Sequence, residues 1–395
     1  MDDIFVQFLD LIKAALNQRP SDLSIEDPGK LIRLFEAHGL PHFLFYHAQW
    51  SSEALMPDQR YRQHLKRMAF VSATKDATQD REMAEIAGAF SKDRLWVLPL
   101  KGYELKRLYP SSEMRHMSDT DLLISVDQAE QVKICLERIG FVNHRFGQGS
   151  TDLYTSPTGL QYEIHRSLEE EGFNEQSQDF LKNLLSLAVP VPEHTHFLTL
   201  PHELHYAYIL CHFVKHLLSG GIGIRQVMDI YLCRKKWTFD EEKLEKLLRE
   251  LELREFAATI EKLANHWFGD GEGDSVTEEL GEYILGSGVF GKEEQKVADR
   301  MLKEKKKQSK LSYIWSRLFP SYQSMCFYYP VLKKWAVLLP VFWLWRILYA
   351  LIFRRGKLKR EVSTVSGTDH EAVVQRAAFY RRCGLNVYSE YVSKK

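Results

Sequence analysis

Two aspartates separated by one residue, Asp119 and Asp121, are the clearest sign of chemistry in the chain. They open residues 119–126, a short apolar segment that is predicted to be a β-strand. Residues two apart on a strand project to the same face, so both carboxylates would point the same way. Their mutual repulsion would be relieved by an Asp→Asn change or by a divalent cation, which prefers oxygen ligands. The pair therefore predicts a metal site, and Mg²⁺ there would also hold the phosphates of a nucleoside triphosphate.

A third acid, Glu163, lies in residues 160–166, which are also predicted to be a strand. Glu163 and His165 would share one face of this strand, while the apolar residues beside them face the other way. If the two strands are neighbours, Glu163 completes a carboxylate site with Asp119 and Asp121. Two metal ions about 3.5–4 Å apart at such a site would activate an acceptor hydroxyl and stabilise a leaving pyrophosphate.

Four residues that precede the aspartate pair are candidates for phosphate contact. Lys101 and Gly102 follow a short apolar run, and glycine permits a turn at which backbone N–H groups approach a phosphate. Arg115 suits a phosphate and a structural acid such as Glu113 equally well, because its guanidinium binds both. Ser118 is expected to stabilise the loop rather than to react. A surface lysine and exposed strand-end acids are the alternative interpretations, and the ordered set of residues argues against them.

Taken in order, these features resemble the DNA-polymerase-β-like nucleotidyltransferase superfamily, in which a glycine motif precedes an Asp-x-Asp strand and a later strand carries a third acid. They are closer still to a family of uncharacterised bacterial nucleotidyltransferases, from about residue 95 to residue 232. The matching motifs are Leu100-Lys101-Gly102, Tyr109-Pro110, Arg115, Ser118-Asp119-Thr120-Asp121-Leu122-Leu123 and Glu163-Ile164-His165, then a helical region with His212, His216, Arg225 and Asp229.

The resemblance implies transfer of a nucleoside monophosphate from a nucleoside triphosphate, such as ATP, to an acceptor hydroxyl with Mg²⁺ or Mn²⁺. Asp119 and Asp121 would bind the metals, and Glu163 would complete the site and help to accept the hydroxyl proton. The acceptor stays open between a small molecule, a sugar, a protein side chain and an RNA end. The nucleotide would be held by Lys101, Gly102, Arg115 and Ser118.

Two departures from the family pattern bear on activity. Gly102-Tyr103 stands where the superfamily usually has Gly-Gly or Gly-Ser, although Lys-Gly is normal for the closer family. Glu163 stands where relatives more often have Asp, and its longer side chain changes the metal geometry. A weakly active or inactive nucleotide-binding protein therefore stays open as a rival function. The C-terminal segment leaves a second rival open, a membrane-surface scaffold.

Three histidines share a predicted helix face after Pro201, because His205, His212 and His216 are separated by seven and then four residues. No Glu follows His212 as a zinc-protease motif requires, and no cysteine pair is available. The face is therefore expected to be structural or substrate-facing, without zinc. Farther along, Arg225 and Asp229 are four residues apart and are expected to form an ion pair, a nucleobase or acceptor contact being the alternative.

Composition limits the class of protein. Lys+Arg and Asp+Glu both number 53 in 395 residues, so no overall positive charge favours nucleic acid as a partner. Hydrophobic residues make up 45% and charged residues 27%, which is ordinary for a globular protein with a sizeable core. The five cysteines are scattered without a CxxC pair, which argues against a disulfide framework. A reducing, cytoplasmic setting fits best, and the acidic start lacks the features of a signal peptide.

The hydrophobic pattern predicts an α+β protein: a nucleotidyltransferase fold, with a small mixed β-sheet and helices, flanked by N- and C-terminal helical regions. Short strands are expected only between residues 95 and 166, and helical spacing prevails before and after them. The expected divisions are an N-terminal helical region, residues 1–92; the nucleotidyltransferase core, residues 93–200; a helical domain, residues 201–300; and a C-terminal helical region with an apolar segment and a basic cluster, residues 301–395.

Residues 335–353 are nearly all apolar, and a basic run follows at once in residues 354–360. A bilayer span needs about 20 apolar residues, and Pro340 and Arg346 interrupt this stretch. Burial against the domain, or a helix lying in a membrane interface, is therefore expected rather than a true span. A peripheral membrane contact through this region, and with it a membrane-associated location, stays open.

Overall fold

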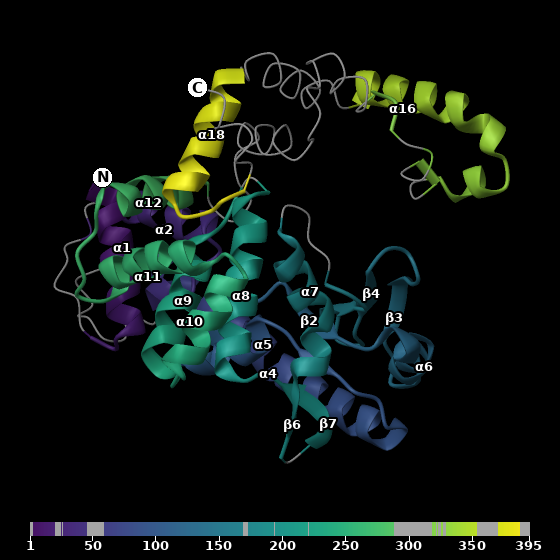
Figure 1. The fold of residues 1–395 in the computed structure, drawn as a ribbon, viewed down its shortest axis with the longest axis horizontal. Helices are drawn as coiled ribbons and strands as arrows, with labels where there is room; N and C mark the ends of the chain where they lie inside the picture. Colours follow the sequence, from purple (N-terminus) through teal and green to yellow (C-terminus); the bar gives the residue numbers. More distant parts are fainter. Residues whose placement is uncertain are drawn as a thin grey trace. The chain divides into compact units, whose positions relative to one another are not determined.

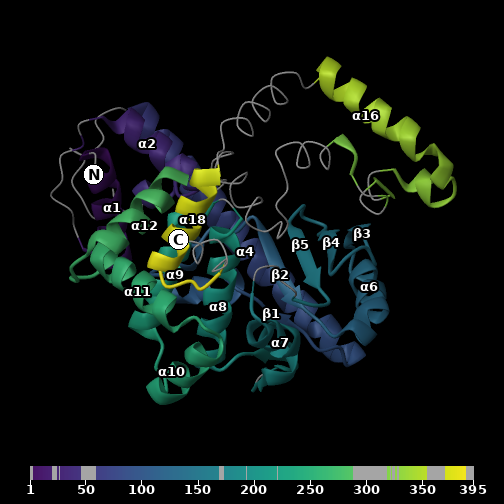
Figure 2. The ribbon, with the colours of Figure 1, turned by 45° about the horizontal axis from the view of Figure 1, so that its top comes forward.

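The computed structural model describes most of the chain, and Figures 1 and 2 show it from two directions. The described residues are 3–19, 25, 27–45, 59–168, 173–192, 194–219, 221–287, 318–320, 322, 325–326, 329–353 and 370–387. The chain divides into two compact units. Unit 1 comprises residues 1–217, 222–290 and 382–386, and unit 2 comprises residues 218–221, 291–381 and 387–395.

A five-stranded mixed sheet forms in unit 1, with the strand order β1-β2-β5-β4-β3. The adjacent strands β2 and β5 run parallel, whereas every other neighbouring pair is antiparallel. Parallel neighbours need a long connection, and here it contains a helix and the outer strands. The strands are β1 (Leu98–Pro99), β2 (Asp119–Leu123), β3 (Val142–Arg145), β4 (Thr151–Thr155) and β5 (Gln161–His165).

One face of the sheet is buried beneath two helices, α4 (Gln59–Asp93) and α6 (Ala129–Arg138) (Figure 2). Side chains from the strands and from both helices form one hydrophobic cluster there. It includes Leu122, Tyr162 and Ile164 from the strands, Met83, Ile86 and Phe90 from α4, and Val132 and Leu136 from α6. Because side chains alternate along a strand, Asp121 and Glu163 lie on the opposite face.

Buried polar contacts tie α4 to the two parallel strands. Glu82 is 2% exposed and accepts hydrogen bonds from the hydroxyls of Tyr162 at 2.9 Å and Thr158 at 2.6 Å. Gln79, on the same helix, donates its amide to Thr120 Oγ1 at 3.0 Å. A buried carboxylate is costly unless it is hydrogen-bonded. These contacts therefore fix where the sheet lies on α4, and with it the face that carries the acids.

The rest of unit 1 is largely a helical bundle (Figure 1). Helix α11 packs against α1, α9, α10 and α12, while α8 packs against α9 and α10. The helices are α1 (Asp3–Leu16), α2 (Pro28–Ala37), α8 (His202–Leu217), α9 (Ile224–Lys236), α10 (Glu241–Glu250), α11 (Arg254–Phe268) and α12 (Ser275–Ser287).

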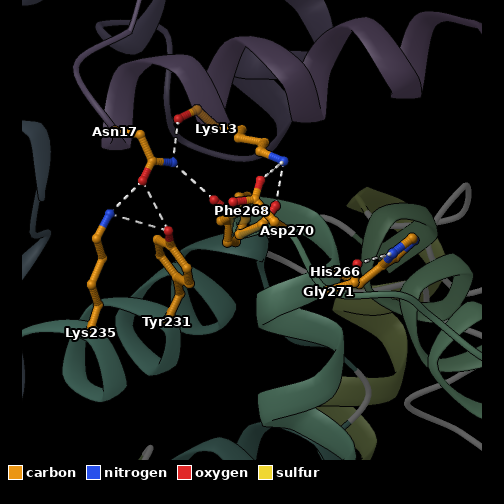
Figure 3. A network of polar contacts seen from close by, with 9 residues as sticks. Lys13, Asn17, Tyr231, Lys235, His266, Phe268, Asp270 and Gly271 are labelled. Atoms are coloured by element: carbon orange, nitrogen blue, oxygen red, sulfur yellow. Dashed lines mark hydrogen bonds and ion pairs between the residues drawn. The ribbon is translucent and has the colours of Figure 1, made fainter.

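Asn17, just after α1, joins three helices of the bundle through polar contacts (Figure 3). Its amide donates to the carbonyl of Phe268 at 2.9 Å. Its side-chain oxygen accepts from Tyr231 at 2.9 Å and from Lys235 at 2.6 Å. Lys13 adds a hydrogen bond to the carbonyl of the residue that follows α11. The N-terminal helix is thus part of the same bundle as α9 and α11.

Short elements complete the described parts. In unit 1 they are α5 (Gly102–Leu105), η2 (Lys106–Leu108), η3 (Ser112–Met114), η4 (Val126–Gln128), α7 (Glu175–Asn183), η5 (Leu184–Leu187), β6 (Val189–Val191) and β7 (His194–Thr199). Strands β6 and β7 form a separate antiparallel pair. The elements assigned mainly to unit 2 are η6 (Pro330–Lys333), η7 (Ala336–Leu338), α16 (Leu339–Phe353) and α18 (His370–Arg382). All five cysteines are free and buried.

The predicted α+β class, a small mixed sheet flanked by helices, is confirmed. Strands β2 and β5 are shorter than residues 119–126 and 160–166, the segments that predicted them, and β1 has only 2 residues. The β6–β7 pair was not predicted, because Pro190 and the two histidines of β7 interrupt any alternation of apolar residues. The domain boundaries stay predictions. No helix within the described ranges is long and apolar enough to cross a membrane.

Candidate active site

The parallel register of β2 and β5 sets Asp121 opposite Glu163, and sets Asp119 opposite Gln161. The two acid-bearing strands are therefore neighbours, as the metal-site hypothesis requires. Asp121, Glu163 and His165 each present a ligand atom, and these atoms all lie within 4.8 Å of one another. Across the part of the chain that the structure describes, no other such group of His, Cys, Asp and Glu side chains occurs. Asp119 lies outside this group of three.

Asp121 is held by two positively polarised partners. Lys101 Nζ lies 3.1 Å from its Oδ1 atom, and His165 Nε2 lies 2.7 Å from the same oxygen. Burial alone would raise the pKa of Asp121, whose side chain is 11% exposed. The charge of Lys101 and the hydrogen bond from His165 outweigh burial and hold the pKa well below its ordinary value. The carboxylate is therefore ionised at neutral pH, as a metal ligand must be.

His165 belongs to this cluster, although it was not predicted from the sequence to be a metal ligand. Its Nε2 atom donates to Asp121, because an ionised carboxylate only accepts. Its Nδ1 atom lies 3.1 Å from Thr151 Oγ1, and its Nε2 atom lies 3.7 Å from Glu163 Oε2. The signal was available in the sequence, since the alternation that places Glu163 on the acidic face also places His165 there.

Lys101 reaches Asp121 from an unusual backbone conformation. Its φ of 46° and ψ of −112° lie in a region that favours glycine. Such a residue costs about 1–3 kcal/mol and persists only where its surroundings fix it. At Gly102, an added Cβ would overlap the side chains of Met117 and Arg115. A side chain at position 102 would therefore have to displace Met117 or Arg115, and the turn aims the Lys101 ammonium at the acidic face.

The segment after this turn is anchored to α4 by a buried lysine. Lys106 is 1% exposed, and its Nζ atom lies 2.7 Å from Asp76 and 2.6 Å from Asp80. Ser112 donates to Asp76 at 2.5 Å, so one carboxylate serves both ends of the segment. A buried lysine is stable only when it is paired, and the paired acids lie on α4. The loop that leads into β2 is thereby fixed to the same helix as the sheet.

Arg115 forms a buried ion pair with Asp229 on α9. Its Nε and Nη2 atoms donate to the two carboxylate oxygens at 2.8 and 2.7 Å. Tyr109 also donates to Asp229, at 2.8 Å. Burial alone would lower the pKa of Arg115, but the Asp229 carboxylate outweighs burial and raises it. A phosphate contact by Arg115 would require this bidentate pair to open, so the structure favours the structural alternative for Arg115.

This pair also corrects two expectations. The structural acid given as an example for Arg115 was Glu113, but Arg115 pairs with Asp229, and Glu113 accepts a hydrogen bond from Ser111. Arg225 was expected to pair with Asp229 one turn away, and that expectation is wrong: Asp229 is taken by Arg115, and Arg225 donates to the carbonyl of His116. Both residues of the predicted helical pair do lie on α9. Helical spacing made their contact feasible, but a bidentate partner from the loop occupies both carboxylate oxygens.

Ser118 lies immediately before β2 and is exposed. Its carbonyl accepts a hydrogen bond from Lys75 Nζ of α4 at 3.3 Å. The half-buried Asp119 follows as the first residue of the strand. The predicted nucleotide contact of Ser118 and the predicted metal contact of Asp119 stay predictions.

The histidine face of α8 divides into two parts. His212 and His216 contact each other, with their Nε2 atoms 3.0 Å apart. Burial, with the charges of Lys101, Lys215 and Arg225, lowers the pKa of His216 to about 4, while Asp121 acts in the opposite direction. This pair is therefore close to the acidic face and neutral at pH 7. His205 is buried beside the ring of Trp237, and burial lowers its pKa to about 3.

A family model described as an uncharacterised nucleotidyltransferase matches residues 24–269. The match covers more than half of the chain, including β2, β5 and the helices α8 and α9. It confirms the resemblance that the ordered motifs indicated. No match was found among curated proteins or among solved structures.

Proposed function

Because this chain belongs to the family of uncharacterised nucleotidyltransferases, we propose that it transfers a nucleoside monophosphate from a nucleoside triphosphate to an acceptor hydroxyl. The observation that supports the proposal most directly is the pairing of Asp121 with Glu163 across parallel strands, with His165 on the same face. The acceptor is proposed to be a small molecule, a sugar or a protein side chain, since the chain has no excess positive charge for nucleic acid.

The donor atoms of this cluster fit a divalent cation. Carboxylate oxygens are the ligands that Mg²⁺ and Mn²⁺ prefer, and the imidazole of His165 shifts the preference toward a transition-metal ion such as Mn²⁺. Asp121 and Glu163 would hold the ion, and Asp119 would take part at the edge of the site or hold a second one. When bound, the metal supplies charge stabilisation to the phosphates and makes the acceptor hydroxyl more acidic.

Lys101 is placed to contact either the Asp121 carboxylate or a phosphate of the nucleotide. In this structure the Lys101 ammonium lies 3.1 Å from Asp121 and neutralises it. A cation on Asp121 would remove the need for that ion pair, and the ammonium would then be free to contact a phosphate oxygen. Gly102, which follows it, has no side chain to block the approach of a phosphate to the backbone.

Glu163 is the acid best placed to meet an acceptor. Its side chain is 34% exposed, compared with 11% for Asp121. A carboxylate within reach of a hydroxyl accepts its proton as a general base. We therefore assign Glu163 to both metal binding and proton transfer, whereas Asp121 binds metal only.

A nucleotide-binding protein with little or no turnover is the second candidate function. The observation that favours it is the His165 hydrogen bond, which occupies the same oxygen of Asp121 that Lys101 contacts. A metal ligand with both contacts on one oxygen must release at least one of them before it binds a cation through that atom. The two candidates differ in whether pyrophosphate is released.

The deciding experiment follows label from each nucleoside triphosphate in the presence of Mg²⁺ or Mn²⁺ and a cell extract. The wild type should label an acceptor and release pyrophosphate, and Asp119→Asn and Asp121→Asn should abolish both. Glu163→Gln should reduce transfer while leaving residual metal binding. The identity of the labelled species would then define the acceptor.

Matched controls are Asp179→Asn on α7 and Glu130→Gln on α6, two exposed acids on helices that lie outside the cluster. Both should behave as wild type. Metal-dependent nucleotide binding without pyrophosphate release would favour the second candidate. Nucleotide binding that is equal with and without metal, together with Asp variants that match wild type, would contradict the assignment.

A further inference from the structure

Two positive side chains lie near Asp119 and form no ion pair with any acid that the structure describes. Lys75 belongs to α4, and Arg225 belongs to the first turn of α9. We propose that Lys75 and Arg225 form the binding site for the phosphate chain of the substrate, beside Asp119. This inference rests on the proposed function, since it names the residues that hold the triphosphate at that site.

Arg225 carries a charge that no acid neutralises at contact distance. Its Nη1 atom donates to the backbone carbonyl of His116, and within the described ranges no carboxylate lies within ion-pair distance of it. The acid one turn away, Asp229, is occupied by Arg115. Burial and the neighbouring charge of Arg115 lower the pKa of Arg225, while Asp229, Tyr109 and Asp119 act in the opposite direction. A half-buried guanidinium in this position favours an anion as its missing partner.

Lys75 likewise donates to a backbone carbonyl rather than to a carboxylate. Its Nζ atom donates to the carbonyl of Ser118 at 3.3 Å, and none of the described acids forms an ion pair with it. Burial lowers the pKa of Lys75, Arg225 lowers it further, and Asp119 acts in the opposite direction. Lys75 and Arg225 donate to the carbonyls of Ser118 and His116, which are two residues apart in the chain, so the two charges lie close enough to repel each other. An anion between them would remove that repulsion and compensate both charges.

The two cations predicted from the sequence to contact phosphate are already paired with acids. Lys101 is paired with Asp121, and Arg115 is paired with Asp229. Among the described residues, Lys75 and Arg225 are therefore the two cations beside Asp119 that form no ion pair with an acid. Arg225 offers a planar set of N–H donors and Lys75 a point charge, a combination that suits phosphate oxygens.

The position of Arg225 strengthens the same conclusion. It lies in the first turn of α9, whose N-cap residue, Gly223, provides no side-chain acceptor. The helix dipole at that end adds to the positive potential of the two side chains. An extended phosphate chain would reach from the N-terminus of α9 to a cation held by Asp119 and Asp121.

Calorimetry of the full chain with inorganic tripolyphosphate and Mg²⁺ tests the inference without requiring any nucleotide chemistry. Lys75→Met and Arg225→Gln should each weaken tripolyphosphate binding about tenfold or more, because each removes a charged hydrogen-bond donor. Lys75→Arg retains the charge and should bind at close to the wild-type affinity. Lys66→Met, an exposed lysine elsewhere on α4, is the matched control and should have no effect.

The outcomes separate this inference from the proposed function. Variant-sensitive binding of tripolyphosphate without any label transfer would sustain the phosphate site and contradict the transferase. Label transfer with unchanged KM and unchanged tripolyphosphate affinity in both variants would sustain the transferase and overturn the phosphate site. Failure of the wild type to bind tripolyphosphate would overturn the phosphate site as well. If Arg225→Gln does not fold, Lys75→Met compared with Lys75→Arg decides.

A different observation, in unit 2, carries a second inference. Helix α16 and the residues before it expose many large apolar side chains, among them Val337 at 78%, Leu344 at 60% and Trp345 at 59%. Exposed apolar patches of this kind mark interaction surfaces. In the sequence, five basic residues follow within residues 354–360. We infer that α16 docks on an anionic membrane surface through its apolar side chains, and that the basic run in the sequence accounts for the preference for anionic lipid.

Sedimentation with lipid vesicles tests this second inference. Full-length protein should sediment with vesicles of phosphatidylcholine and phosphatidylserine, and far less with phosphatidylcholine alone. The double variant Leu344→Glu, Trp345→Glu should abolish sedimentation, whereas Phe70→Glu, at an exposed apolar residue of α4, should not. Equal binding to both vesicle types, or binding to neither, would overturn the inference. Self-association that the same double variant abolishes would assign the surface to a second copy instead.

Discussion

His165 Nε2 lies 2.7 Å from Asp121 Oδ1, and the two residues belong to adjacent parallel strands. The hydrogen bond orients the carboxylate and helps to keep it ionised. It also places an imidazole within ligand distance of any ion that Asp121 and Glu163 hold. His165 is therefore either a ligand itself or the group that positions one.

Replacing His165 by Gln should weaken metal binding whichever of these roles it has. Groups that ligate or orient a metal ligand typically contribute about 10–100-fold to affinity, and we expect a loss in that range for Mn²⁺. Titration of Mn²⁺ by calorimetry measures it. His144→Gln is the control, since His144 is exposed on β3, outside the cluster, and its ring contacts Thr155. Wild-type affinity in His165→Gln would remove His165 from the site.

Asp121→Asn should destabilise the metal-free protein at neutral pH. From the sequence alone, relief of the repulsion between Asp119 and Asp121 predicts a more stable variant. In the structure, the contacts of Asp121 with Lys101 and His165 dominate, and the variant loses them. Loss of a charged hydrogen bond in a nearly buried group costs about 1–3 kcal/mol. Urea unfolding in EDTA at pH 7 measures the difference in the free energy of unfolding. A more stable variant would show that the repulsion dominates.

The difference in the free energy of unfolding between wild type and Asp121→Asn should depend on pH in a defined way. The pKa of Asp121 is lowered in the folded state, so its contribution to stability is complete above its unfolded pKa of about 3.9. That contribution is lost as the pH falls from there toward the folded-state pKa. The difference between wild type and Asp121→Asn should therefore be constant between about pH 5 and 7 and should shrink below about pH 4. A difference that grows on acidification would contradict the lowered pKa.

At position 101, glycine and methionine should have different effects on stability. Lys101→Gly relieves the backbone strain at φ 46°, whereas Lys101→Met retains it, and both remove the ammonium that pairs with Asp121. We expect the glycine variant to be more stable than the methionine variant by about 1–3 kcal/mol. Nucleotide binding should weaken in both. Thermal unfolding and calorimetry measure the two effects, and equal stability of the two variants would refute the strain.

Alanine substitution should have opposite effects at two glycines of unit 1. Gly102→Ala places a Cβ against Met117 and Arg115, so we expect destabilisation of about 1–3 kcal/mol. Gly88→Ala on α4 meets no atom within 4 Å and should stabilise the protein by up to about 1 kcal/mol. Chemical unfolding of both variants checks the contrast. A neutral Gly102→Ala would mean that the turn has room to relax.

Local patterns in the sequence were sufficient to predict which polar side chains share a face of each strand. Alternation alone put Asp119 and Asp121 on one face of β2 and Glu163 with His165 on one face of β5, because successive strand residues must point to opposite sides. Apolar periodicity separated the helical ends from the short sheet, and the ordered motifs identified the family that the match over residues 24–269 confirms.

The tertiary structure decided which of these groups meet. Alternation does not set the register between two strands, so only the β2–β5 pairing shows that Asp121, rather than Asp119, lies opposite Glu163. Helical spacing predicted an ion pair between Arg225 and Asp229. Instead, Arg115 from a distant loop donates two aligned hydrogen bonds to Asp229 and forms the pair. That exchange leaves Arg225 beside Lys75, a juxtaposition of α9 and α4 that depends on how the bundle packs on the sheet. Pairings between distant segments follow from packing and charge competition, and spacing along one segment does not contain them.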